Sequence, residues 1–277
     1  MRLTAYCFLL LLLSCKSTTR EEKNRQAIEG KWLIVYPDEQ LRSSDEERIY
    51  AAIQDSLVQL KGLKLVAFEK SGLFYQADHP ERKGIWKIND DKRFVIEEGG
   101  DGFSPFRATL TQAGKESMIL TEFVRYEGES LELDWHLVKM KEKEAAVFFD
   151  EDKNKWKQRP ALPETEKALK EKLASMLDYY AAYYLYIRER SSYFIPGRVL
   201  LPFQFYQHAV GLRPLKNCPS FQQLFFDSAQ AARAHSFLEN GMRSLAGQFP
   251  KSEENSYVHE YALYMKLLAK EMRKAGE

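Results

Sequence analysis

Leu131-Glu132-Leu133-Asp134-Trp135-His136-Leu137 alternates large apolar side chains with charged or polar ones at every position. Successive side chains of a β-strand point to opposite faces, so this spacing predicts a strand with one apolar face and one polar face. The stretch is the last and most regular in a series of such patterns. It therefore indicates that the preceding residues form an antiparallel sheet whose strands each have one apolar face.

Seven further strands are predicted before it, separated by residues that favour tight turns. The turns at Lys70-Ser71-Gly72, Asn89-Asp90-Asp91, Ala113-Gly114 and Glu127-Gly128 contain residues that tolerate positive φ or hydrogen-bond their own backbone. The first strand surrounds Trp32, and a helix from Asp45 to Gly62 is predicted after it. The other strands are expected near residues 63–69, 73–77, 84–89, 92–97, 105–111 and 116–125, with the last at 130–139.

Eight antiparallel strands joined by hairpins leave two exposed edges unless the sheet closes on itself. An up-and-down barrel removes these edges, and eight strands enclose an interior that side chains fill or that holds one small ligand. We therefore expect an α+β protein with an eight-stranded barrel over residues 28–140. Residues 141–160 are expected to be a linker with an apolar centre, and residues 161–277 an all-α helical domain.

Two motifs in the barrel region resemble those of lipocalins and lipocalin-like domains. Gly30-Lys31-Trp32 is similar to the Gly-x-Trp that opens such barrels, and Thr121-Glu122-Phe123-Val124-Arg125-Tyr126 is similar to a motif found late in them. The family usually has an arginine that stacks over the tryptophan, and Lys139 is nearest to that place. The resemblance implies a site for a small hydrophobic molecule, although some members are plugged by their own side chains. The candidate lining residues are Trp32, Trp86, Phe94 and Trp135.

After Pro160 the apolar spacing changes from two residues to an alternation of three and four. This seam predicts a helix of about 27 residues that packs lengthwise on another helix; its members are Leu169, Leu173, Met176, Tyr180, Tyr183 and Ile187. Two later helices, one beginning at Pro219 and one capped by Ser252, are expected to cover it. Tyr193 to Gly211 is predicted to form a loop and a short helix. This half resembles no family.

Five tyrosines lie between Tyr179 and Tyr186. We expect most of them to pack inside the helical domain, because the seam places Tyr180 and Tyr183 on its buried face. The alternative is a docking surface for another envelope protein, since tyrosine offers contact area and a hydrogen-bonding tip. That surface would consist of Tyr179, Tyr186, Tyr193 and Phe194.

The chain starts with Arg2, an apolar run from Tyr6 to Leu13, Ser14 and Cys15. This arrangement resembles the lipobox of bacterial lipoproteins, in which the cysteine becomes the first mature residue and carries the lipid. The resemblance implies a signal peptide over residues 1–14, lipidation of Cys15 and a polar tether over residues 15–27. It also favours the outer membrane, because Lys16 is not acidic, and leaves the leaflet open. The alternative is an ordinary cleaved signal peptide.

Composition and motifs favour binding over catalysis. The net charge is +1 and no long block of like charge suggests a nucleic-acid partner. Processing leaves Cys218 as the one cysteine available, so no disulfide or multi-cysteine metal site is expected. His235 and Glu239 stand one helical turn apart, but no second segment supplies further metal ligands. We expect no enzyme, metal or cofactor; the expected partners are membrane lipid through Cys15 and a small apolar ligand, or an envelope protein.

Overall fold

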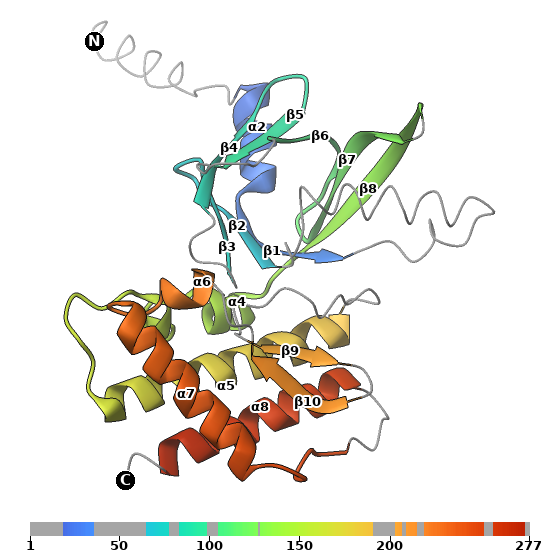
Figure 1. Ribbon diagram of the computed structural model, residues 1–277. Helices are drawn as coiled ribbons and strands as arrows, with labels where there is room; N and C mark the ends of the chain where they lie inside the picture. Colours follow the sequence, from blue (N-terminus) through green and yellow to red (C-terminus); the bar gives the residue numbers. More distant parts are fainter. Residues whose placement is uncertain are drawn as a thin grey trace, which may run out of the picture.

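The computed structural model shows a β-barrel joined to a layer of helices (Figure 1). It describes residues 19–35, 65–77, 83–98, 105–126, 128–190, 203–206, 209–214, 219–251 and 257–274. The predicted helix from Asp45 to Gly62 and the predicted cap at Ser252 lie outside these residues. None of the helices that the structure describes is both long and apolar enough to cross a membrane.

Eight antiparallel strands close into an up-and-down barrel in which each strand pairs with its neighbours in chain order and β1 pairs with β8. This confirms the predicted barrel and the α+β class. The strands are β1 (Gly30–Val35), β2 (Leu65–Phe68), β3 (Leu73–Gln76), β4 (Lys83–Ile88), β5 (Arg93–Glu98), β6 (Phe106–Ala113), β7 (Ser117–Tyr126) and β8 (Glu129–Lys139).

The Gly-Lys-Trp motif lies where the barrel closes. Trp32 is fully buried, pairs with Lys139 across the closure, and donates a hydrogen bond of 2.8 Å from its Nε1 to the Ile28 carbonyl. The Lys139 ammonium lies 5.4 Å from the centroid of the Trp32 ring, a cation–π contact. Gly30 has φ +147°, and a Cβ there would lie 3.0 Å from Lys139 Cε. The motif thus allows β1 and β8 to approach each other closely.

The described part of the predicted tether is helical from Arg20 onward. Helix α2 (Arg20–Ile28) lies across one end of the barrel, where Arg25 donates a 3.0 Å hydrogen bond to the Lys70 carbonyl. The Arg25 guanidinium lies 5.1 Å from the Trp86 ring centroid, and Ile28 is buried in the barrel interior. Ile28 is the one buried residue of α2, so the sequence has no apolar periodicity from which this helix could be predicted.

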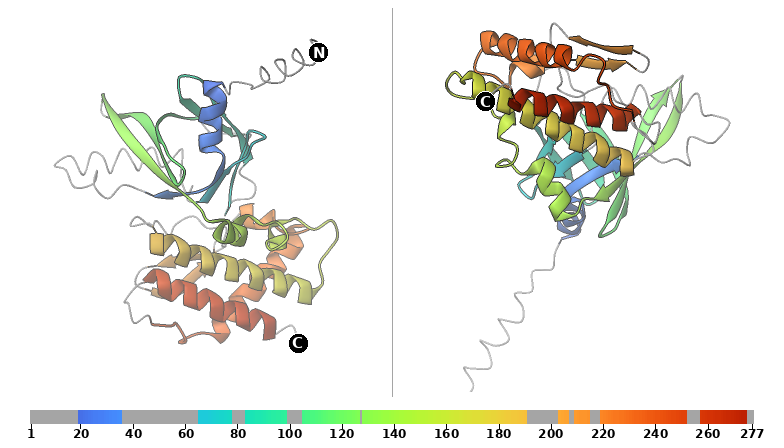
Figure 2. Two further views of the ribbon diagram at one scale, coloured as in Figure 1. Left: turned by 180° about the vertical axis from the view of Figure 1, so that it is seen from behind. Right: turned by 90° about the horizontal axis from the view of Figure 1, so that it is seen from below.

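The helical half contains α4 (Glu142–Phe149), the 3₁₀ helix η2 (Lys155–Lys157), α5 (Glu166–Arg190), α6 (Pro219–Gln222), α7 (Ser228–Ser244) and α8 (Tyr257–Lys274). The long helix predicted from the apolar seam is confirmed, because α5 buries all six seam residues and lies alongside α8 (Figure 2). The all-α prediction needs one correction: β9 (Phe203–Tyr206) and β10 (Ala209–Pro214) pair where a loop and a short helix were expected. Short aromatic stretches such as Phe203–Tyr206 do not distinguish strand from helix by period.

The helical half and the outer wall of the barrel form one apolar core, which is separate from the core inside the barrel. Leu33, Leu65 and Ala67 point outward from β1 and β2 and belong to the same buried cluster as the helices. Residues 141–160, expected to be a linker, contribute three large side chains to that cluster: Phe148, Phe149 and Trp156. The outer wall of the barrel is therefore one side of the core of the helical layer.

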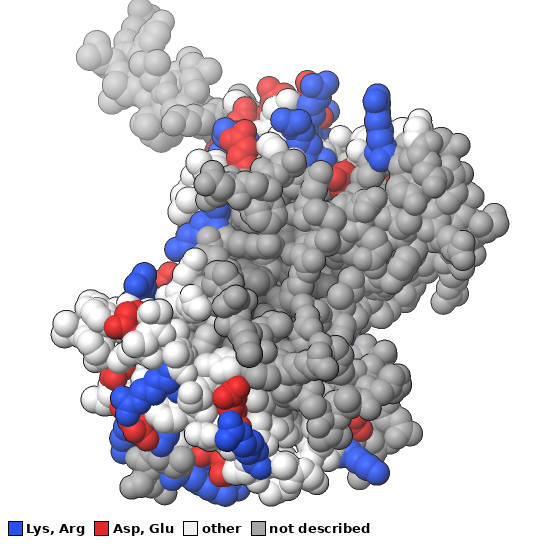
Figure 3. All heavy atoms as spheres, viewed as in Figure 1, with Lys and Arg blue, Asp and Glu red and all other residues white. Residues whose placement is uncertain are grey.

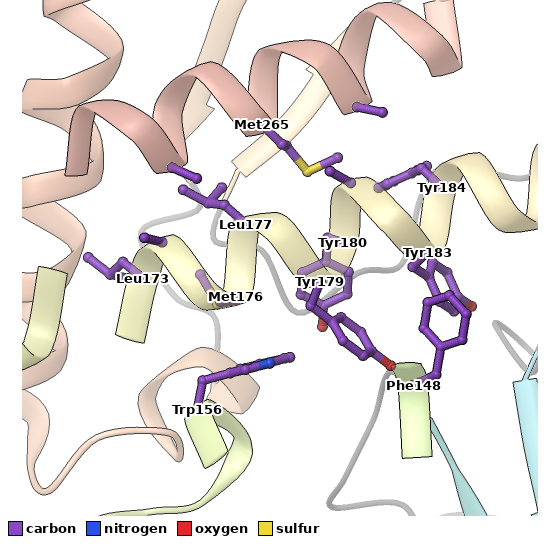
Figure 4. Close-up of a cluster of buried hydrophobic side chains, with 14 of the residues drawn as sticks. Phe148, Trp156, Leu173, Met176, Leu177, Tyr179, Tyr180, Tyr183, Tyr184 and Met265 are labelled. Atoms are coloured by element: carbon purple, nitrogen blue, oxygen red, sulfur yellow. The ribbon is translucent and has the colours of Figure 1, made fainter. Parts of the chain in front are cut away.

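Hydrogen bonds to the end of β3 fasten this joint. The Tyr179 hydroxyl donates to the Ala77 carbonyl at 2.8 Å, and the Lys157 ammonium donates to the same carbonyl at 2.6 Å and to the Phe148 carbonyl at 2.9 Å. Tyr179 and Phe148 point toward each other between α5 and α4 (Figure 4). Both apolar and polar contacts therefore hold α4 and α5 against the end of β3.

We predict that Gly30→Ala destabilises the fold by about 3 kcal/mol, because the new methyl group would need an unfavourable φ and would press on Lys139 and Trp32. Gly128→Ala is the matched control: φ there is +88°, but no atom lies within 4 Å of the added Cβ. It should cost about 1 kcal/mol, which is the cost of placing a Cβ in the left-handed region of φ. Urea unfolding followed by tryptophan fluorescence measures both variants. Equal losses would contradict close packing at the barrel closure.

Candidate functional site

The four aromatic residues predicted to line a ligand cavity all lie in the barrel interior. Trp32, Trp86, Phe94 and Trp135 are buried in one cluster, and Phe106 stands between Phe94 and Trp135 with its ring centroid 6.3 and 6.4 Å from theirs. The cavity left among the surrounding side chains measures about 10 Å³. That volume is at the lower limit for a single water molecule. Among the described residues, these aromatics form a filled core.

Glu122 lies in this interior, and its inward position was not predicted. Its Oε2 accepts a 3.0 Å hydrogen bond from Trp135 Nε1, and its side chain is buried. Burial raises the pKa of the Glu122 carboxyl to about 7, an effect that the bond from Trp135 partly opposes. The sequence carried a signal for this position, since Met118, Leu120 and Glu122 share one face of a strand.

The tyrosines proposed for partner docking do not form an exposed surface in the described residues. Tyr179 is only 5% exposed, and its ring packs against Trp156 at a centroid distance of 5.2 Å. Tyr186 donates a 3.1 Å hydrogen bond to Glu144, and its pKa is raised to about 12, first by burial and then by the Glu144 carboxylate. Both residues hold α5 against its neighbours. Tyr193, Phe194 and Cys15 lie outside the described residues.

A larger pocket lies at the joint between the barrel and the helical half. It has a volume of about 450 Å³, and three stretches of chain line it: the end of β3 with the start of β4, the segment from Phe148 to Arg159, and the turn after α6. We call it the joint pocket. Its lining combines aromatic, charged and amide side chains, among them Tyr75, Lys83, Phe149, Glu151, Arg159 and Gln223.

The walls of the joint pocket are fixed by hydrogen bonds. Asn154 is buried and donates from its amide to the Val147 carbonyl at 3.0 Å and to the Asp150 carbonyl at 2.8 Å. The Arg159 guanidinium donates at 2.8 Å to the Phe226 carbonyl, which ties the segment to the region after α6. A pocket with such walls needs little rearrangement to accept a ligand, which favours binding.

No arrangement typical of catalysis appears among the described residues. His235 Nδ1 lies 3.7 Å from Glu239 Oε1, and no group of three or more His, Cys, Asp or Glu side chains suited to a metal ion is found in the described part of the chain. Positive and negative side chains are interspersed on the face shown in Figure 3. The joint pocket is therefore the candidate binding site among the described residues.

Comparison with known proteins gives no family: no family model matches the chain, and no curated protein matches its sequence.

We predict that Glu122 makes the stability of the protein depend on pH. Its pKa is about 7 in the folded protein against an ordinary 4.5, so the folded state keeps a proton that the unfolded state has released. The stabilisation is complete below pH 4.5 and is lost as the pH rises through 7. Since Gln stays neutral and still accepts from Trp135, Glu122→Gln should gain about 3 kcal/mol relative to the native protein between pH 4 and pH 8.

Glu132→Gln is the matched control, because Glu132 lies on the neighbouring strand with its side chain exposed. Urea unfolding at several pH values would measure the three proteins. Native protein and Glu122→Gln with the same pH dependence would show that Glu122 is not held in an apolar surrounding.

Proposed function

We propose that the protein is a non-catalytic binding protein of the bacterial cell envelope, which takes a small ligand into the joint pocket and uses the barrel as a rigid support. One comparison carries this proposal. Among the described residues, the cavity inside the barrel measures about 10 Å³, whereas the joint pocket measures about 450 Å³. Ligand sites in proteins occupy roughly 300–1,000 Å³. The proposal retains the ligand-binding function that the lipocalin resemblance implies. It places the ligand in the joint pocket, outside the barrel wall, and not in the barrel interior.

The proposed membrane anchor is a lipid on Cys15, in the outer membrane. Five residue steps separate Cys15 from Arg20, the first residue of α2, and a chain of that length spans at most about 18 Å. The barrel end that α2 covers would then face the membrane surface. The helical layer lies on the side of the barrel away from α2 (Figure 1). The joint pocket would stand at a distance from the lipid headgroups.

The anchor can be tested by Cys15→Ser. We expect the native protein in the membrane fraction of the producing bacterium and the variant in the soluble envelope fraction, because several acyl chains together hold a protein durably in a bilayer. Cell fractionation with immunoblotting measures this, and a mass shift on the native N-terminal peptide identifies the lipid. Membrane attachment of the variant equal to that of the native protein would refute lipidation at Cys15.

The pocket can be tested with two neighbouring glutamines. Gln223 lines the joint pocket, whereas Gln222 is exposed beside it and does not. We expect native mass spectrometry of the purified protein to show a bound small molecule. Gln223→Trp should remove it by filling the pocket, and Gln222→Trp should retain it. Retention of the molecule in both variants would exclude the joint pocket as the binding site.

A further inference from the structure

Two cations of the joint pocket are not offset by any carboxylate that the structure describes. Lys83, at the start of β4, has an exposed side chain and no ion pair with a described residue. Arg159 donates one hydrogen bond to the Phe226 carbonyl, and no described carboxylate pairs with it. By contrast, Lys87 lies four residues further along β4, on the same face, and its ammonium is 2.7 Å from the Glu97 carboxylate. Within the described residues, the pocket therefore presents two cations without a carboxylate partner.

The acidic residues of the pocket compensate this charge only in part. Asp150 already accepts a 2.9 Å hydrogen bond from the Asp152 amide and lies 3.9 Å from the Lys153 ammonium. Glu151 is the other carboxylate among the described lining residues. Lys157 adds a third ammonium, which is held by two backbone carbonyls and lies 4.0 Å from the Tyr179 ring centroid. Among the described lining residues, three cations (Lys83, Lys157 and Arg159) thus stand against two carboxylates (Asp150 and Glu151).

The same pocket has an aromatic wall. The Phe149 ring is nearly buried and meets the Tyr75 ring edge-on, with 5.7 Å between their centroids. Leu224, which is also buried, lies in the lining from the other side of the joint. An apolar ligand body placed here would lose contact with water, while a charged head could remain near the exposed cations. The two kinds of lining suit a ligand that combines an apolar body with an anionic head.

We propose that the joint pocket binds a small organic anion, in which a carboxylate or phosphate contacts Lys83 and Arg159 and an apolar body lies beside Tyr75 and Phe149. This assignment rests on the proposed binding function and names its ligand class. Charge-assisted hydrogen bonds to carboxylate and phosphate are stronger than neutral ones, and the guanidinium of Arg159 can form two in parallel. The affinity should fall as salt concentration rises, because both cations are exposed.

The probes are 3-phenylpropionate and phenyl phosphate, with 3-phenylpropanol as the neutral counterpart. Binding to the purified full chain is measured by isothermal titration calorimetry and by saturation-transfer NMR. We expect both anions to bind about tenfold more tightly than the alcohol. Lys83→Gln and Arg159→Gln should each weaken the anions by about fivefold and leave the alcohol unchanged.

Lys155→Gln is the matched control. Lys155 lies in η2 two residues from Lys157, is exposed, and pairs with Asp152 at 3.7 Å, but it does not line the pocket. Its substitution should not change binding. Arg159 also binds the Phe226 carbonyl, so the stability of Arg159→Gln is measured by thermal unfolding. If this variant is unstable, the result for Lys83→Gln alone decides the outcome.

Three results would overturn the assignment. Equal affinity for the anions and the alcohol would leave a binding pocket without charge selectivity. Equal weakening by Lys155→Gln would indicate a general effect of surface charge. Tighter binding of L-phenylalanine than of 3-phenylpropionate would make Glu151 a recognition group and the ligand a zwitterion. In each case Gln223→Trp and Gln222→Trp still test whether the joint pocket binds a ligand. Failure of the anion assignment is therefore distinguishable from failure of the binding function.

Discussion

The pairing of β1 with β8 around Trp32 is the contact on which the other parts of the structure depend. It turns an open sheet into a barrel, and closure brings aromatic side chains together in the interior, where the cavity among the described residues measures about 10 Å³. Closure also forms the end that α2 covers. It directs Leu33, Leu65 and Ala67 outward as a curved apolar wall, against which the helical layer packs.

The joint pocket follows from that wall. Its lining comes from β3 and β4 on one side and from the segment between α4 and α5 on the other, so it exists only where the two halves meet. The bonds from Tyr179 and Lys157 to the Ala77 carbonyl hold the two sides together.

The fold was largely predictable because its main signals are local. Alternation along most strands predicted the barrel, and the apolar seam of α5 predicted the long helix. The hairpin of β9 and β10 has strands too short for a period, and α2 buries only Ile28. The site was not predictable, because Lys83 and Arg159 stand far apart in the sequence and belong to no motif. The aromatics Trp86, Phe94 and Trp135 were correctly placed inside the barrel, but the packing that fills it depends on all eight strands.

The shared core has a consequence for how this chain can be divided. A barrel cut off after Met140 would present Leu33, Leu65 and Ala67 to water, and α4 and α5 would lose the barrel wall against which Phe148 and Tyr179 pack. Exposed apolar stripes of this kind promote self-association. The two halves are therefore a poor source of exchangeable modules, and recombination between relatives would preserve solubility only if the wall and its helical cover were inherited together.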